Sequence, residues 1–167
     1  MRKKRLRNLW VFIDESAGVY AVVVVSERRV DSLSSRLAWV KHFRILGKEE
    51  KKGYIRAFPR RFIAIRSSLE YARTYTKLSM LSRFIENISG NVKVLCIDDK
   101  GDRLLAEMGF RAEKHGIQVI LESRIRHLPQ RIKQKTRRPI ILADNLANYA
   151  RLMIQRGRPE NARKLEK

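Results

Sequence analysis

The chain has 167 residues, of which 38 are lysine or arginine and 17 are aspartate or glutamate, so its formal net charge at pH 7 is +21. This length suits one domain with a sizeable hydrophobic core. The hydrophobic content of 44% excludes a wholly disordered chain. A folded protein with so large a positive charge is expected to associate with polyanions, with nucleic acid as the first candidate and an anionic membrane surface as the second.

The same composition excludes several other classes. The single cysteine, Cys96, lies inside an apolar run and rules out both a disulfide framework and a cysteine-rich zinc site. The longest apolar runs, 9–13 and 19–25, are much shorter than the ~20 residues that a membrane span needs. The basic start of the chain is not followed by an adequate apolar segment for a signal peptide. We therefore expect a cytoplasmic protein without a membrane partner.

The first predicted element is an antiparallel hairpin. The apolar run 9–14 ends in Asp14, and the β-branched run 19–26 is too short for a helix and reads as a buried strand. Four residues, Glu15 to Gly18, separate the two runs, and Gly18 can supply a positive φ angle if the turn requires it.

Helix and strand signals alternate in the rest of the chain. The elements expected are a helix from Asp31 or Ser32 to Ile45, strand material broken by Pro59 over 54–65, a helix over 67–88, a strand over 92–98, a helix over 100–115, a strand over 117–121 and, after a basic connection over 122–138, a helix from Pro139 to Arg156. An opening hairpin followed by this alternation predicts an α/β fold with a mixed sheet flanked by helices. We expect a single domain over 9–156 with a helical insertion near 31–53, between basic tails at 1–8 and 157–167.

Acidic residues are scarce in this chain, so their positions are informative. Asp14 and Asp98 each end a predicted strand, Asp144 lies early in the last predicted helix, and Glu70 lies in the first turn of the helix predicted over 67–88. Sites in α/β proteins gather at strand ends. Carboxylate oxygens are suitable ligands for Mg²⁺ or Mn²⁺, and two such ions can activate a water and stabilise the leaving oxygen in phosphodiester cleavage.

Two local motifs and the order of the elements resemble the ribonuclease H-like superfamily, which includes retroviral integrases and Holliday-junction resolvases. The segment Val11-Phe12-Ile13-Asp14-Glu15-Ser16 is similar to the Asp-Glu-Ser-Gly opening of an uncharacterised branch of that superfamily, with Ala17 in place of the glycine. The segment Leu142-Ala143-Asp144-Asn145-Leu146-Ala147 resembles that branch's Leu-Ala-Asp segment near its C-terminus.

The resemblance implies a ribonuclease H-like fold and a set of acidic residues that bind two Mg²⁺ or Mn²⁺ ions. Asp14, Glu70, Asp98 and Asp144 match the family's acidic positions, and His127 matches a mobile histidine that some members carry. The metal ligands implied are Asp14, Asp98 and Asp144. Three alternatives stay open: Glu15 competes with Asp14, Asp99 competes with Asp98, and Glu70 is equally well explained as the capping-box partner of Ser67.

Basic residues are concentrated in three segments. One lies in the predicted connection that leads into Asp144 and comprises Arg124, Arg126, Arg131, Lys133, Lys135, Arg137 and Arg138. A second is interleaved with aromatic residues and includes Arg56, Arg60, Arg61 and Arg66. The third is the N-terminal run from Arg2 to Arg7. Cationic side chains contact phosphates and aromatic rings can stack on unpaired bases, so the first two segments are the candidate surfaces for DNA or RNA.

The leading hypothesis from the sequence is a metal-dependent nuclease that acts on nucleic-acid phosphodiesters. A PIN-like ribonuclease is a second possibility, although PIN-like chains usually pass from the first strand into a helix rather than into a hairpin. The non-enzymatic alternative is a nucleic-acid-binding protein on the same fold.

Overall fold

The computed structural model describes residues 7–167 and contains one five-stranded mixed sheet with the strand order β3-β2-β1-β4-β5. The strands are β1 (Leu9–Ser16), β2 (Val19–Ser26), β3 (Tyr71–Tyr75), β4 (Val92–Ile97) and β5 (Gln118–Leu121). β2 is antiparallel to β1 and to β3, whereas β4 is parallel to β1 and to β5. The predicted α/β class, the mixed sheet and the opening hairpin are therefore confirmed, and the sheet order is compatible with a ribonuclease H-like fold.

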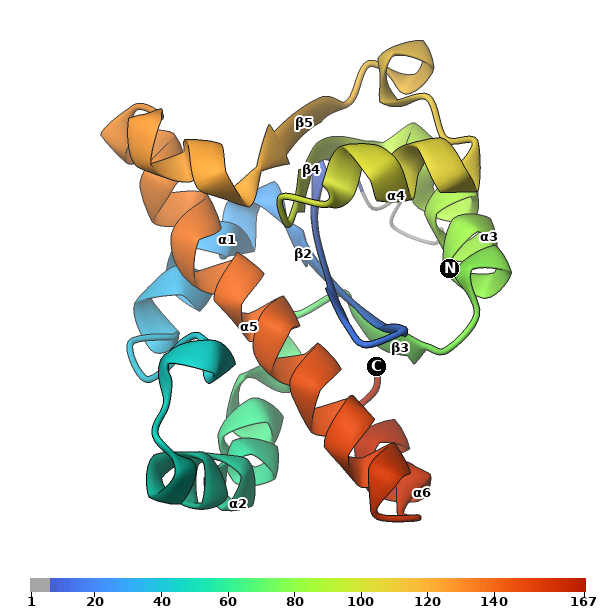
Figure 1. Ribbon diagram of the computed structural model, residues 1–167. Helices are drawn as coiled ribbons and strands as arrows, with labels where there is room; N and C mark the ends of the chain where they lie inside the picture. Colours follow the sequence, from blue (N-terminus) through green and yellow to red (C-terminus); the bar gives the residue numbers. More distant parts are fainter. Residues whose placement is uncertain (1–6) are drawn as a thin grey trace, which may run out of the picture.

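Helices cover both faces of the sheet (Figure 1). The helices are α1 (Glu27–Arg36), α2 (Lys48–Ile65), α3 (Leu78–Ile88), α4 (Gly101–Met108), α5 (Gln130–Gln155) and α6 (Pro159–Arg163). Short 3₁₀ helices occur between them: η1 (Phe43–Ile45), η2 (Arg66–Ser68), η3 (Ser89–Asn91), η4 (Ala112–His115) and η5 (Glu122–His127). α5 crosses one face of the sheet and α3 and α4 cover the other (Figure 1). No helix of residues 7–167 is long and apolar enough to cross a membrane.

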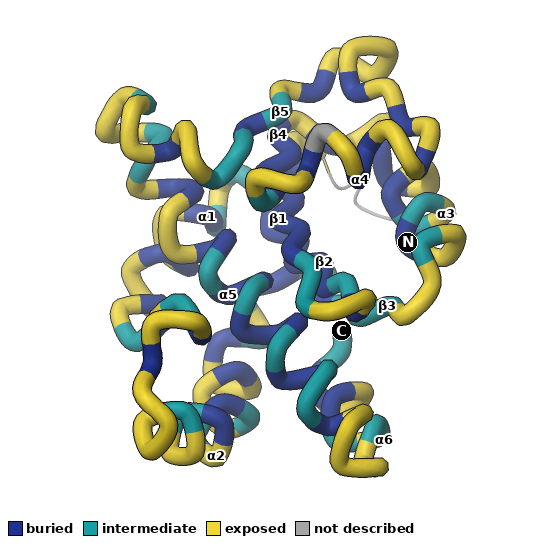
Figure 2. The backbone as a smooth tube through the Cα atoms, viewed as in Figure 1, coloured by how far each residue is buried: buried dark blue, intermediate teal, exposed yellow. Residues whose placement is uncertain are grey.

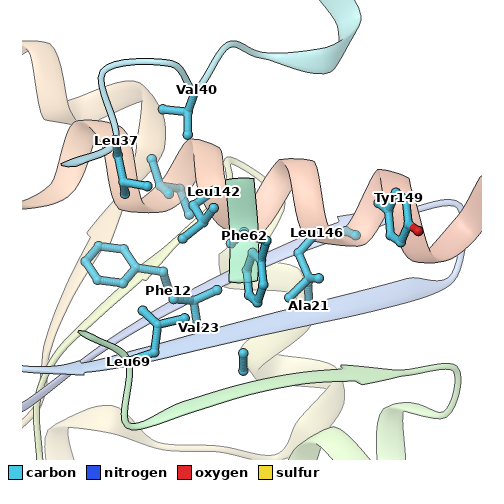
Figure 3. Packing of buried hydrophobic residues seen from close by; sticks show 14 of the residues in the cluster. Phe12, Ala21, Val23, Leu37, Val40, Phe62, Leu69, Leu142, Leu146 and Tyr149 are labelled. Atoms are coloured by element: carbon cyan, nitrogen blue, oxygen red, sulfur yellow. The ribbon is translucent and has the colours of Figure 1, made fainter. Parts of the chain in front are cut away.

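The alternation of side chains along the central strands divides the core into two layers. Trp10 and Phe12 of β1 pack with Cys96 of β4 beneath α5, whereas Val11 and Ile13 pack on the opposite face beneath α3 and α4. The side of α5 that faces the sheet is buried along most of its length (Figure 2). Figure 3 shows Leu142 and Leu146 of this helix lying over the sheet residues of the first layer.

The opening hairpin turns through two residues, not the four expected. Ala17 has a φ angle of 46° and Gly18 has a φ angle of 81°, the combination of a two-residue turn with both central residues in the left-handed region. Ala17 occupies the position of the glycine in the related Asp-Glu-Ser-Gly motif, so a residue with a side chain adopts a conformation that glycine reaches at lower cost.

The segment 54–65, expected to be strand material, is the second half of α2. Its buried residues Ile55, Phe58, Phe62 and Ile65 follow helical spacing, and they face the core beside α5. Pro59 lies inside this helix. Proline removes one backbone donor and usually interrupts a helix, which is why the segment was predicted as broken strand material. The helical spacing of its apolar residues was the better indicator. The helix predicted from Asp31 or Ser32 to Ile45 is also wrong, because α1 begins at Glu27 and ends at Arg36.

The helix predicted over 67–88 is wrong in its first half. β3 occupies Tyr71–Tyr75, and only the second half is helical, as α3. The Ser67–Glu70 spacing does not cap a helix, because the Glu70 backbone N–H donates to the Val24 carbonyl oxygen over 2.8 Å at the start of the β2–β3 pairing. β3 thereby completes the antiparallel half of the sheet.

Two further boundaries differ near the C-terminus. α5 begins at Gln130, so the residues after Pro129 that were assigned to a connection are helical and Pro139 is inside the helix. The segment 157–167, expected to be a basic tail, contains α6, and its Leu165 is only 1% exposed. Lys167 exchanges two backbone hydrogen bonds with Ala72 of β3, which anchors this segment to the sheet. The basic run from Arg2 to Arg5 lies outside the described residues.

Candidate active site

Three acidic residues occupy equivalent positions near the C-terminal ends of the three parallel strands, although Asp14 lies within β1 and not at its end as expected, because pairing with β2 extends β1 to Ser16. Ile13 of β1 pairs with Ile97 of β4, and Ile97 pairs in turn with Leu121 of β5. The next residue along each strand direction is acidic: Asp14, Asp98 and Glu122. Because paired residues of parallel strands lie at one level, these carboxylates are brought to one edge of the sheet.

The same three side chains also share a face of the sheet. Phe12, Cys96 and Ile120 each lie two residues before one of these acids and pack in the layer beneath α5. Side chains two residues apart point to the same face of a strand, so the acids point toward α5. They line a cavity of about 660 Å³ together with Asp144 of α5.

Asp144 is held in place by hydrogen bonds to both of its carboxylate oxygens. Its Oδ1 accepts a hydrogen bond from Asn148 Nδ2 over 3.0 Å, and its Oδ2 accepts one from the Phe43 backbone N–H over 3.1 Å. Asn145 Nδ2 is a second donor to Oδ2, at 3.3 Å. These donors come from α5 itself and from the start of η1, so they fix Asp144 against the segment that closes the cavity on that side.

A chain of side chains continues from Asn148 to the hairpin. Ser16, which follows Asp14 and Glu15 in the opening motif, donates to Asn148 Oδ1 over 2.9 Å and accepts from Arg151 Nε over 2.8 Å. Through Asn148, the end of β1 is therefore linked to Asp144. This link gives the serine of the motif a structural function.

Burial and mutual repulsion raise the pKa of the clustered carboxyl groups. Asp14 is only 7% exposed, and its burial, followed by the negative charges of Asp144 and Asp98, raises its pKa from 3.8 to about 8. Burial is also the main reason that the pKa values of Asp98 and Asp144 are raised, with Glu122 adding to both. The cavity thus holds more negative charge than its surroundings compensate, and a bound cation would relieve this repulsion.

His42 provides a local positive charge when it is protonated. Its Nε2 lies 3.1 Å from a carboxylate oxygen of Glu122, and its Nδ1 lies 4.0 Å from Asp144 Oδ2. The hydrogen bond with Glu122 raises the pKa of His42, although burial opposes this effect. His42 therefore joins the acid at the end of β5 to the acid on α5.

The two ambiguous neighbours of the predicted acids have other partners. Glu15 Oε1 accepts the Gly18 backbone N–H over 3.0 Å within the hairpin turn, and Asp99 Oδ1 accepts the Ser123 N–H over 2.8 Å. Both residues still line the cavity. Asp99 is exposed, however, whereas Asp98 is half-buried. Asp14 and Asp98 consequently match an internal site better than their neighbours do.

Two residues assigned to the site by resemblance do not line the cavity. Glu70 precedes β3 instead of lying on a helix, and its carboxylate lies 3.9 Å from Arg29. Its backbone pairs with Val24, three residues along β2 from the partner of Asp14, which corresponds to about 10 Å. His127 is exposed at the end of η5, where its Nε2 accepts a hydrogen bond from Arg126 Nε over 3.1 Å.

The predicted basic residues lie in several different environments. Arg126 lines the acidic cavity with Arg44 and Lys100, and Lys133 and Arg137 line an adjoining pocket. Arg124 and Arg131 are exposed, and Arg138 donates to the Ser34 carbonyl oxygen.

Lys135 is buried and bonds to Asp31, so it is removed from the candidate phosphate contacts. The remaining three residues, Arg56, Arg60 and Arg61, lie on α2 and are exposed. The guanidinium of Arg61 lies over the ring of Trp39.

The donor set consists of one buried carboxylate, Asp14, and three half-buried ones whose charges repel one another. Such oxygen donors suit a hard divalent cation. Its spacing is more open than that of a closed metal site. Across residues 7–167, leaving aside the side chain of Asp102, no three histidine, cysteine or carboxylate side chains lie close enough together to hold a metal ion. Metal binding by these residues would therefore require their side chains to draw together.

Sequence reasoning missed Glu122 and His42. A signal for Glu122 was present, because it directly follows a predicted strand just as Asp98 does. His42 lies in the segment between α1 and α2, and its nearness to Glu122 depends on the tertiary fold alone. Comparison of the chain with known protein families and with curated proteins gave no match.

Proposed function

We propose that the protein is a metal-dependent nuclease of the ribonuclease H-like superfamily that cleaves phosphodiester bonds of nucleic acid with two divalent ions. One observation carries the proposal: Asp14 near the end of β1, the acids that follow β4 and β5, and Asp144 of α5 line a single cavity in a strongly basic protein. The strand order, the antiparallel hairpin and the two local motifs support this assignment. The hairpin disfavours the PIN-like alternative.

In this proposal Asp14, Asp98 and Asp144 hold Mg²⁺ or Mn²⁺, and Glu122 is a further oxygen donor. The bound ions would supply an activated water and stabilise the leaving oxygen. Arg126, at the rim shared with the adjoining pocket, contacts the phosphate backbone as it enters. The positive charge of residues such as Arg126 would attract a polyanion to the cavity, whereas the carboxylates inside it would bind cations.

Paired variants test the assignment of the ligands. Labelled single-stranded and duplex DNA and RNA are incubated with protein in Mn²⁺, and the products are separated on a denaturing gel. Asp14→Asn and Asp98→Asn should abolish cleavage, because each removes a proposed carboxylate ligand. Their neighbours provide matched controls, and Glu15→Gln and Asp99→Asn should retain cleavage. Unchanged cleavage by Asp14→Asn, with its binding of nucleic acid intact, would reject the proposed site.

A nucleic-acid-binding protein without catalysis is the second candidate, and one observation favours it. Both oxygens of Asp144 are already hydrogen-bonded, and the acids of the described chain are spaced too widely for a preformed metal site. Thermal unfolding with and without Mn²⁺ separates the two functions. A nuclease should gain stability from Mn²⁺ and lose that gain in Asp14→Asn, whereas a binding protein should show no Asp14-dependent gain.

A further inference from the structure

A second hollow adjoins the acidic cavity and differs from it in chemistry. It has a volume of about 390 Å³ and lies between η5 and the first half of α5. Three of its lining residues are apolar, namely Ile125, Ile140 and Ile141, and we call this hollow the isoleucine pocket. Ile125 and Ile140 are buried in the core, whereas Ile141 remains partly accessible.

The isoleucine pocket adjoins the acidic cavity. The two hollows share His42, Glu122 and Arg126 as lining residues. Lys133 and Arg137 of α5 also line a third hollow of about 480 Å³ between α1 and α5. The three hollows therefore lie in succession, from the clustered acids to the N-terminal part of α5, and we call this succession the path.

The charges along this path suit a phosphate backbone. Arg126, Lys133 and Arg137 border the isoleucine pocket, and its single acid, Glu122, is paired with His42 over 3.1 Å. In the third hollow, Asp31 is paired with Lys135 over 2.9 Å. The acids beside the path are thus compensated locally, and the exposed arginines keep their charge for an anion.

The apolar floor selects for a particular form of nucleic acid. In a duplex each base is stacked between its neighbours, and its flat faces are not accessible to protein. An unpaired base can lay its face on the accessible part of Ile141 while its phosphates contact the bordering cations. The volume is within the range of pockets that bind small organic groups.

We propose that the isoleucine pocket binds an unpaired base of a strand whose backbone continues into the acidic cavity, so that the substrate class is single-stranded or locally unpaired nucleic acid. This inference rests on the proposed nuclease function for the direction of the strand. The binding of the base itself does not depend on cleavage.

The experiment measures binding in EDTA, where metal-dependent cleavage cannot occur. Fluorescence anisotropy gives the affinity for a labelled 12-nucleotide oligo-dT strand, for the same strand with abasic sites in its central half, and for a 12-base-pair duplex. Wild-type protein should bind oligo-dT about 5-fold or more tightly than the abasic strand, because a base buries apolar surface against the pocket that an abasic site lacks. Equal affinity for the normal and abasic strands, or tighter binding of the duplex, would overturn the proposal.

Two variants locate the effect. Ile141→Thr should weaken binding of oligo-dT but leave binding of the abasic strand unchanged, because it alters the floor and no phosphate contact. Arg137→Ala should weaken both strands alike and reduce the salt dependence by about one phosphate contact. Arg156→Ala is the matched control, since Arg156 is exposed at the far end of α5. If Ile141→Thr weakened both strands equally, or neither, the base would not lie in this pocket.

The outcomes separate this proposal from the nuclease proposal. Base-dependent binding without cleavage in Mn²⁺ would retain the pocket and remove the catalytic function. Cleavage in Mn²⁺ with no base-dependent binding would retain the catalytic function and remove the pocket. If Ile141→Thr fails to fold, the comparison of the normal and abasic strands with wild-type protein still decides the question.

Discussion

His42 and Glu122 form an ion pair across the acidic cavity, with 3.1 Å between the imidazole Nε2 and a carboxylate oxygen. The pair connects the segment between α1 and α2 to the residue that follows β5. When His42 is protonated, its charge opposes the effect of Glu122, whose carboxylate raises the pKa of Asp144. The stability of this side of the cavity should therefore depend on the charge of the histidine.

The first prediction concerns His42→Gln, which removes the titrating group but keeps a polar side chain. The hydrogen bond with Glu122 raises the pKa of His42 in the folded state. The resulting stabilisation is complete below the unfolded pKa of about 6.5 and is lost as pH rises through the folded value. Thermal melts at pH 5.5 and pH 9 should show a larger loss of Tm for the variant at pH 5.5. Equal losses at both pH values would contradict the charged pair.

The second prediction concerns Asp14→Asn in the absence of metal. Because the folded-state pKa of Asp14 is raised from 3.8 to about 8, the folded protein retains a proton that the unfolded chain releases between these values. Wild-type stability should thus fall as pH rises from 3.8 to about 8 and then level off. Asp14→Asn lacks the titrating carboxyl group. In EDTA, the difference between the Tm of the variant and that of the wild-type protein should therefore shift in favour of the variant as pH rises over the same interval. Parallel pH profiles of the two proteins would show that Asp14 titrates normally.

The third prediction concerns the hairpin turn. Ala17 adopts a φ angle of 46°, and replacement by glycine removes a left-handed strain of about 1 kcal/mol. Ala17→Gly should therefore raise Tm by roughly 2–4 °C. The reciprocal control is Gly18→Ala, at a φ angle of 81°, which should lower Tm. A decrease of Tm in Ala17→Gly would mean that the entropy of the unfolded chain outweighs the relief of strain.

The fourth prediction separates Lys135 from the other basic residues of its segment. Lys135 is 9% exposed, its Nζ lies 2.9 Å from Asp31 and 5.8 Å from the centre of the Trp10 ring. Lys135→Met keeps the buried stem and removes the charge, so it should lower the free energy of unfolding by up to about 1 kcal/mol. Chemical denaturation measures this loss, and anisotropy should show little change in affinity for oligo-dT. A loss of affinity as large as that of Arg137→Ala would return Lys135 to the nucleic-acid contacts.

The three central strands of the sheet could be predicted from the sequence because their signals are strong and local. β1, β2 and β4 are runs of buried β-branched and aromatic residues, and no competing pattern overlaps them. β3 was missed because its five residues alternate only weakly and follow a false capping box at Ser67. Only pairing with β2 makes this segment a strand, and such long-range pairing is invisible in local patterns.

The site could be predicted in part for the same reason. Asp14 lies near the end of a strong strand, Asp98 directly follows another, and the motif around Asp144 is local. Glu70 was misplaced because its assignment required a helix that does not exist there. His42 could not be found, since its position follows from the path of the chain between α1 and α2. Residues contributed by regular elements were thus predictable, and a residue contributed by an irregular segment was not.

The two sides of the cavity should differ in their rates of amide hydrogen exchange, because β1 is a central strand and the segment around η1 is irregular. β1 is hydrogen-bonded along both sides, to β2 and to β4, so amide exchange beside Asp14 should require opening of the whole domain. His42 and Arg44 lie in a segment held by short turns around η1, where opening should need far less free energy. Substrates and ions would therefore meet a rigid strand that carries Asp14 on one side of the cavity. The segment on the other side should open locally many times between two global unfolding events.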